Sequence, residues 1–123
     1  MKKLKVFKQV AEHLLNQNEP SMDGDDCVYL NEDCTLQCAV GCLISTENYS
    51  MDLENCTIEV DTVQDAVSKS IGSPLNKEDI NLLSKLQDIH DYKPVEDWYK
   101  SLDTIAEEWF DKPLEEIIDD KIK

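Results

Sequence analysis

The sequence predicts a mainly α fold. We expect a compact single domain, residues 1–123, of five to six helices around a buried, cysteine-rich helix, with at most a small two-stranded β-ribbon (α+β). Apolar residues recur at helical spacing near both ends of the chain. A nearly continuous apolar stretch lies between residues 36 and 44, and strand-like patterns are confined to two short segments.

The first helix is predicted from Leu4 to about Gln17. Pro20 follows it and ends it, because proline has no backbone N–H with which to continue a helix. The apolar residues of this segment are three or four positions apart, which places them on one helical face; they are Leu4, Phe7, Val10, Ala11, Leu14 and Leu15.

The stretch Asp33–Ser45, with the sequence DCTLQCAVGCLIS, is predicted to be the central helix. From residue 36 to residue 44 every position except Gln37 is apolar or glycine. A helix that is apolar on all sides must lie in the protein interior. Asp33 is the expected N-cap of this helix, and Gly41 is its expected close-packing position.

Two short segments are predicted to be strands that pair as a ribbon. Cys27–Leu30 is rich in strand formers and follows the acidic turn at residues 23–26. Cys56–Val60 alternates apolar and polar residues, as a half-buried strand does.

The rest of the chain is predicted to be helical in four segments. The first begins with a capping-box pattern at Asp61 and Gln64, and the second is capped by Asn76 with Asp79 three positions on. The last is a short segment after Pro113. The third has the clearest helical period in the chain, and we assign its stripe to the core: Val95, Trp98, Leu102, Ile105 and Trp109.

Charge is spread unevenly along the chain, whose net charge is −15. Residues 1–17 carry four lysines and one acid, residues 18–68 carry twelve acids and no lysine, and residues 69–123 carry eight lysines and fourteen acids. There is no arginine, the residue best suited to bidentate phosphate contacts. Direct nucleic-acid binding is therefore not expected, whereas a protein partner with a basic surface is.

An acidic interaction surface is predicted for the middle of the chain, between residues 23 and 65. This segment contains no lysine. The acidic residues of the predicted surface are Asp23, Asp25, Asp26, Glu32, Asp33, Glu47, Asp52, Glu54, Glu59, Asp61 and Asp65. The structural alternative is a solvated face that serves solubility alone.

The cysteines offer an alternative function. Cys34, Cys38 and Cys42 recur every four residues and Cys27 precedes them, so a small zinc-binding or thiol-dependent protein would use Cys27, Cys34, Cys38 and Cys42. Zinc sites usually present closely spaced cysteine pairs in loops, whereas Cys34, Cys38 and Cys42 are expected on a helix. Burial away from basic residues also keeps thiols neutral. We therefore expect reduced core cysteines and no metal or other cofactor.

A cysteine-dependent enzyme is the third class of function. Only His13 and His90 are available as a base, and a Cys42–His90 pair oriented by Asp88 or Asp91 is conceivable. His90 lies near a predicted helix end, where a capping or packing histidine is the simpler interpretation. No catalytic residue is therefore predicted, and the chain is not expected to be an enzyme.

The string Cys38-Ala-Val-Gly-Cys-Leu-Ile44, followed by Tyr49 and Glu54, resembles a motif of small uncharacterised bacteriophage and prophage proteins with a central helix of this type. The segment from Leu86 to Asp91 and Trp98 are similar to that group as well. Many of these proteins have a basic, glycine-rich stretch before the helix, where this chain has Asn-Glu-Asp instead. The resemblance implies a phage or bacterial origin and transfers no activity.

These observations together predict a non-catalytic, highly acidic phage-type protein that binds, and modulates or inhibits, a host or phage protein. In the sharper form of this hypothesis the acidic surface mimics nucleic acid. The start of the chain does not resemble a signal peptide, and the longest apolar run is too short to span a bilayer. A cytoplasmic location in the bacterial host, without membrane contact, is therefore expected.

Overall fold

The computed structural model describes residues 1–122 and confirms the mainly α class. None of the helices within these residues is both long and apolar enough to cross a membrane. In chain order the elements are α1 (Lys3–Gln17), β1 (Met22–Asp23), β2 (Asp26–Cys27), α2 (Asp61–Ile71), α3 (Lys77–Tyr92), α4 (Trp98–Phe110) and α5 (Leu114–Ile117). Short 3-10 turns lie between them: η1 (Gly41–Leu43), η2 (Thr46–Asn48), η3 (Met51–Leu53), η4 (Val95–Asp97) and η5 (Asp120–Ile122).

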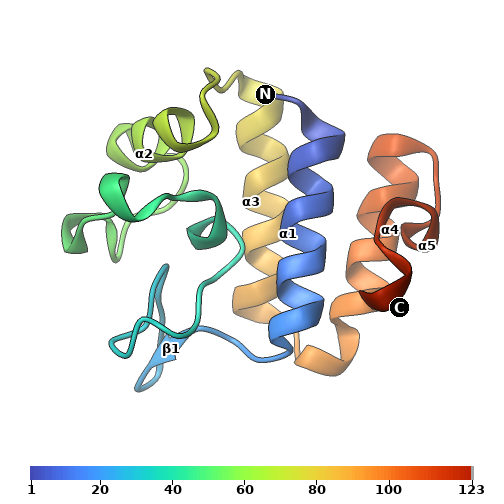
Figure 1. The fold of residues 1–123 in the computed structure, drawn as a ribbon, viewed down its shortest axis with the longest axis horizontal. Coiled ribbons are helices and arrows are strands. Elements are labelled where there is room, and N and C mark those ends of the chain that lie inside the picture. The colour runs from blue at the N-terminus through green and yellow to red at the C-terminus, as the bar shows by residue number, and fades with distance from the viewer. Residues whose placement is uncertain (123) are drawn as a thin grey trace.

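Helices α1, α3 and α4 pack against one another, and α5 packs on α4. Figure 1 shows α1 and α3 side by side in the middle, with α4 and α5 on one side of them. The hairpin β1–β2, the 3-10 turns η1 to η3 and α2 lie on the other side (Figure 1). We call this part of the chain, residues 21–71, the loop lobe.

The apolar faces predicted for α1 and α4 are largely buried, while Leu15, Val95 and Trp109 are half-buried. The aromatic stripe of α4 is confirmed as core at Trp98, whose indole Nε1 donates to the carbonyl oxygen of Lys93 at 3.0 Å. Leu4 of α1 is an exception, since it is exposed. Burial of each large apolar side chain stabilises the fold by about 1.5–3 kcal/mol. The buried residues of the two helices are Val6, Phe7, Val10, Ala11 and Leu14 of α1, and Trp98, Leu102, Ile105 and Ala106 of α4.

Helix α3 begins with the predicted capping box. The N–H of Asp79 donates to Asn76 Oδ1, and the N–H of Asn76 donates to Asp79 Oδ2, both at 2.9 Å. The Asp79 carboxylate is fully buried and lies 2.8 Å from Lys3 Nζ and 3.4 Å from the α-amino group of Met1. The start of α1 is thereby joined to the start of α3. The capping box predicted at Asp61 does not form, because the N-cap of α2 is Val60 and no side chain caps it.

The stretch predicted to be the central helix is buried but irregular. Between residues 33 and 45 only η1 is helical. Cys34 has φ 60°, a value that a right-handed helix does not allow. The prediction of a buried cysteine-rich helix capped by Asp33 is therefore wrong. The burial prediction holds for Cys38, Ala39, Val40, Gly41, Leu43 and Ile44.

The first half of this stretch bonds to residues before it. Asn31 Oδ1 accepts hydrogen bonds from the N–H groups of Thr35 and Leu36 at 2.8 and 3.0 Å. The N–H of Cys38 donates to the carbonyl oxygen of Tyr29 at 3.3 Å. A side-chain amide that binds successive N–H groups takes the donors that an α-helix would use for its i to i−4 hydrogen bonds. The backbone therefore turns here without forming a helix.

The middle of the stretch bonds to side chains of α1 and α3. Gln17 Oε1 accepts from the N–H of Gln37 at 3.0 Å, while Gln17 Nε2 and His13 Nε2 donate to the Gln37 carbonyl at 2.8 and 2.9 Å. Gln87 Oε1 accepts from the N–H of Val40 at 2.9 Å. These bonds meet the requirement that buried backbone groups be paired, and they leave the segment free to be irregular.

Gly41 lies where two backbone segments come closest. A Cβ atom at this position would lie 2.1 Å from the carbonyl oxygen of Tyr29 and 2.9 Å from its carbonyl carbon. Neither of these backbone atoms can move without displacing the segment around Tyr29. Gly41 is therefore a close-packing position, as predicted, although not within a helix.

A small two-stranded ribbon is present, but of the predicted strands Cys27–Leu30 and Cys56–Val60 it contains only Cys27. Met22 pairs with Cys27 and Asp23 with Asp26 in an antiparallel hairpin. Cys56–Val60 is not a strand, because its backbone forms two turns: Cys56 N–H donates to Leu53 and Val60 N–H donates to Thr57. Apolar and polar residues alternate over only five positions here, and a turn that buries Ile58 produces the same pattern as a strand.

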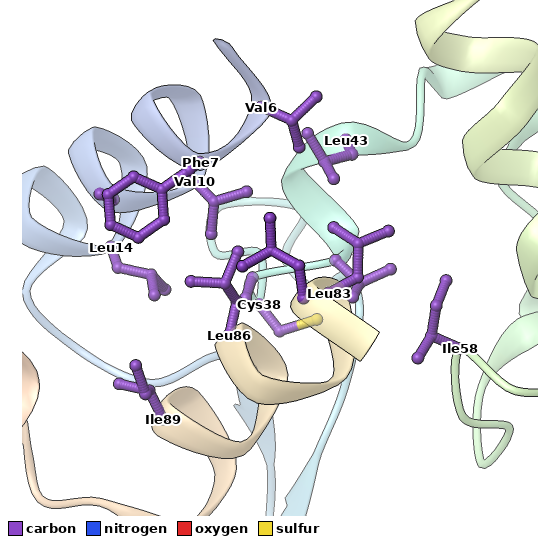
Figure 2. Close-up of a cluster of buried hydrophobic side chains, with 14 of the residues drawn as sticks. Val6, Phe7, Val10, Leu14, Cys38, Leu43, Ile58, Leu83, Leu86 and Ile89 are labelled. Carbon is purple, nitrogen blue, oxygen red and sulfur yellow. The ribbon is translucent and has the colours of Figure 1, made fainter. Parts of the chain in front are cut away.

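Figure 2 shows the part of the core that lies between α1 and α3. The side chains of Cys38 and Leu43, from the irregular stretch, lie among those of the two helices (Figure 2). The stretch therefore fills the space that the predicted central helix was expected to fill. The helix side chains in this view are Val6, Phe7, Val10 and Leu14 of α1, and Leu83, Leu86 and Ile89 of α3.

Replacing Gly41 with alanine should destabilise the protein by about 3 kcal/mol, because the added Cβ overlaps backbone atoms of Tyr29. The matched control is Gly24→Ala. Gly24 has φ 62° and open space around its Cβ position. Alanine there should therefore destabilise the protein by only about 1 kcal/mol, because its side chain disfavours the left-handed conformation. Urea denaturation measures both values. Equal destabilisation by the two substitutions would contradict the close approach of Gly41 to Tyr29.

Asp79→Asn should destabilise the protein by about 1–3 kcal/mol at neutral pH, since it removes the charge that faces Lys3 inside the protein. Burial alone would raise the pKa of Asp79, but hydrogen bonds from Lys3 and the Asn76 N–H outweigh it and lower the pKa below 3.8. The stabilisation is therefore complete above pH 3.8 and is lost as pH falls through the lowered pKa. The difference in unfolding free energy between wild type and Asp79→Asn should shrink at acid pH. A difference independent of pH would contradict this assignment.

Candidate functional site

The predicted acidic surface residues lie in the loop lobe, on hairpin, loop and α2 positions. Ten of the eleven are exposed: Asp23, Asp25, Asp26, Glu32, Asp33, Glu47, Asp52, Glu59, Asp61 and Asp65. No lysine occurs between residues 9 and 68, so no lysine of this segment neutralises them. Lys69, near the end of α2, is the one lysine of the lobe, so the excess of exposed carboxylates gives this side of the molecule a negative potential.

Glu54 is the exception, because it is half-buried and bonded to the loops around it. Its carboxylate accepts hydrogen bonds from the N–H of Tyr29 at 2.9 Å, the N–H of Leu30 at 3.3 Å and the hydroxyl of Tyr49 at 2.7 Å. Burial and the bond to Glu54 raise the pKa of Tyr49 well above its usual range. Glu54 therefore holds two loop segments together and belongs to the structure of the lobe more than to its outer surface.

A basic groove occupies a different part of the molecule, where the first half of α1 meets α5. Its volume is about 570 Å³. Lys8 also lies 3.2 Å from Asp119, which follows α5. Lysines therefore gather at this groove, away from the loop lobe, although Glu116 and Asp119 lie among them. The groove is lined by Lys2, Lys3, Leu4, Lys5, Lys8, Lys112, Glu116 and Ile117.

The four cysteines of the zinc alternative do not gather at one point. Cys34 is exposed on its loop, whereas Cys38 is buried in the core. Cys42 donates from Sγ to the carbonyl oxygen of Ala39 at 3.1 Å, and burial raises its pKa from 9.0 to about 12. Burial likewise raises the pKa of Cys38 far above its usual range. These thiols are neutral at physiological pH, which suits core packing.

One group of ligand-type side chains, which the sequence analysis missed, does form. Sγ of Cys27, a ring nitrogen of His90 and a carboxylate oxygen of Asp91 lie within 4.8 Å of one another, the only such group of three in residues 1–122. Asp91 Oδ1 lies 2.8 Å from both His90 Nδ1 and Gln87 Nε2. Burial, followed by the charge of Asp91 and a hydrogen bond to it, raises the pKa of Cys27 to about 11. We call Cys27, Gln87, His90 and Asp91 the Asp91 node.

The hydrogen bonds of His90 indicate its tautomer. The N–H of Ser21 donates to His90 Nε2 at 2.8 Å, so Nε2 carries no hydrogen. In the neutral ring Nδ1 then carries the hydrogen and donates to Asp91. Neither nitrogen keeps a free lone pair for a metal ion, and neither is available as a base for Cys42. His90 is therefore a packing residue, as the simpler of the two interpretations of the sequence predicts. Its hydrogen bond with Ser21 joins the loop lobe to the end of α3.

A pocket of about 360 Å³ lies beside the Asp91 node, between α3 and the loop lobe. Buried Tyr29, Cys38 and Ile58 form its inner wall. Tyr92 also lines it, although this residue is 79% exposed. Its carboxylates come from two sides, Glu54 and Glu59 from the loop lobe and Asp88 and Asp91 from α3. Among the residues that line it there is no lysine, arginine or histidine.

Only part of this site has a signal in the sequence. The proximity of His90 and Asp91 could be read from their adjacency in the chain, and the acidity of residues 54–59 from composition. Nothing in the sequence placed Cys27 beside Asp91, which is 64 positions away. Comparison with known proteins adds no further assignment, because no family model, curated protein or solved structure matches the chain.

Alkylation should separate the cysteines by their environment. Exposed Cys34 should react first with iodoacetamide at pH 8, and Cys42 and Cys38 last. A rise in pKa from 9.0 to about 12 lowers the thiolate fraction at pH 8 about a thousandfold, and the greater nucleophilicity of a more basic thiolate offsets part of this loss. Cys42 should therefore react on the order of 30-fold more slowly than an ordinary thiol, even before steric protection. Mass spectrometry of peptides from a time course measures this. Reaction of Cys42 as fast as Cys34 would restore the possibility of a reactive thiol.

Proposed function

We propose that this protein is a non-catalytic interaction protein that binds a partner with a basic surface through its loop lobe. The observation that supports the proposal is the set of ten exposed carboxylates on the lobe, in a segment without lysine. A surface of one sign raises the association rate with an oppositely charged partner and disfavours others.

The nature of the partner follows from the same charge. Phosphate backbones would be repelled by the loop lobe, so a protein is the favoured partner and direct nucleic-acid binding is not. The motif that resembles phage and prophage proteins supports a host or phage protein in a bacterial cytoplasm as the partner. In the sharper form of the proposal that partner is itself a nucleic-acid-binding protein, whose basic groove the loop lobe occupies in place of phosphates.

The zinc alternative receives less support. The four cysteines named for it are dispersed, and the histidine in the Asp91 node has both ring nitrogens engaged. A metal at Cys27 and Asp91 would have to break the bond between Ser21 and His90 to recruit the ring. That bond joins the loop lobe to α3, so metal binding there would disturb the fold.

The test is affinity capture from a bacterial lysate, followed by measurement of binding to the captured protein. Neutralising three lobe carboxylates, with Asp52→Asn, Asp61→Asn and Asp65→Asn, should weaken binding about tenfold, at roughly 0.5 kcal/mol for each exposed charge. Binding should also weaken as salt rises from 0.1 to 1 M, because the screening length falls from about 10 to 3 Å.

The matched control neutralises three exposed carboxylates on α4 and α5, with Glu107→Gln, Glu108→Gln and Glu115→Gln. It changes net charge by the same amount and should weaken binding much less. Equal weakening by both triple variants, or binding that salt leaves unchanged, would contradict the proposal. Displacement of the partner by duplex DNA would support the mimicry form, and simultaneous binding of both would contradict that form.

A further inference from the structure

We infer that the pocket between α3 and the loop lobe receives a basic side chain, arginine or lysine, of the partner protein. The inference rests on the proposed function, since it names the anchor point within the acidic surface. The pocket differs from the rest of that surface in being concave. Its volume of about 360 Å³ falls in the range typical of ligand sites.

The charge around the pocket is negative on both sides. Asp88 and Asp91 are three residues apart on α3, and Glu54 and Glu59 face them from the loop lobe. Asp91 is 24% exposed at its side chain, and its hydrogen-bond donors are neutral groups, namely the amide of Gln87 and the Nδ1–H of His90. Carboxylates in a cleft with low-dielectric walls attract a cation more strongly than the same charges on a convex surface.

The uncharged part of the lining fits a side chain that is apolar along its length and charged at its end. Tyr29, Cys38 and Ile58 offer apolar contact for the methylene groups of such a side chain. Tyr92 leaves an aromatic ring 79% exposed beside the carboxylates, where it can stack on a guanidinium or ammonium group. Tyrosine and arginine are also the residues most enriched at the energetic centres of protein interfaces.

A mobile inorganic cation fits this lining less well than a basic side chain does. Glu54 already accepts three hydrogen bonds, and Asp91 Oδ1 accepts two. The remaining carboxylates, Glu59 and Asp88, are exposed, and the described groups of metal-ligating side chains include neither of them. A long basic side chain that enters from the mouth passes the exposed carboxylates of Glu59 and Asp88 and brings its charged end towards the half-buried Glu54 and Asp91.

The probe is a set of capped pentapeptides with two glycines on each side of arginine, lysine, citrulline or norleucine. Amide chemical shifts of the ¹⁵N-labelled full chain report binding. The arginine and lysine peptides should shift residues 27–29, 54–59 and 88–92 at millimolar concentration. The neutral citrulline and norleucine peptides should not. Equal shifts with arginine and citrulline, or shifts spread evenly over the loop lobe, would overturn the inference.

Charge-neutralising variants locate the binding. The double variant Glu59→Gln, Asp88→Asn changes two exposed pocket carboxylates and should weaken the arginine peptide about fivefold. The control double variant Glu47→Gln, Asp65→Asn changes two exposed lobe carboxylates outside the pocket lining and should weaken it less than about twofold. Equal effects of the two would overturn the pocket assignment. Tyr92→Ala should also weaken the arginine peptide, with no effect on the fold because the ring is exposed.

Failure of the inference and failure of the proposed function are distinguishable. If the captured partner binds with the expected salt dependence while the pocket variant behaves as its control does, the acidic lobe acts without this anchor and the inference falls. If the peptides bind the pocket as expected but no basic protein is captured, the pocket is upheld as a basic side-chain site and the proposed function falls.

Discussion

The structure depends on satisfying the backbone of an irregular segment that runs through the core. Residues 36–44 are apolar enough to be buried, yet their N–H and C=O groups need partners wherever the chain is not helical. The side-chain amides of Gln17, Asn31 and Gln87 supply them, from α1, from the preceding loop and from α3. An unpaired buried backbone group costs about 1–3 kcal/mol, so these three residues, together with backbone partners such as the Tyr29 carbonyl, allow the segment to occupy the core.

The same hydrogen bonds link the core to the candidate site. Gln87 accepts from Val40 in the buried segment and donates to Asp91, and Asp91 in turn bonds to His90. His90 accepts from Ser21 at the start of the loop lobe. A continuous chain of bonds therefore connects the buried segment, the end of α3 and the lobe. This arrangement holds the two sides of the pocket in a defined relation, which a binding site on loops needs in order to be selective.

The distribution of charge complements this rigidity. The carboxylates of the loop lobe lie on loops, hairpin and α2, and like charges that repel one another would tend to open such a region. Internal bonds to acidic side chains oppose that tendency: Glu54 holds Tyr29, Leu30 and Tyr49, and Asp23 accepts from the N–H of Glu32 at 3.0 Å. Some acidic residues are thus part of the framework, and the others remain free to meet a partner.

The sequence by itself determined the helical class, the apolar faces of α1 and α4, the capping box at Asn76 and the burial of residues 38–41, because each depends on neighbours in the chain. Tertiary structure decided the rest. The buried segment is not a helix because Gln17 and Gln87 reach it from 20 and 47 residues away. Cys27 joins His90 and Asp91 because the hairpin is held against α3. Apolar composition determines that a segment is buried, whereas the partners of its backbone determine its conformation.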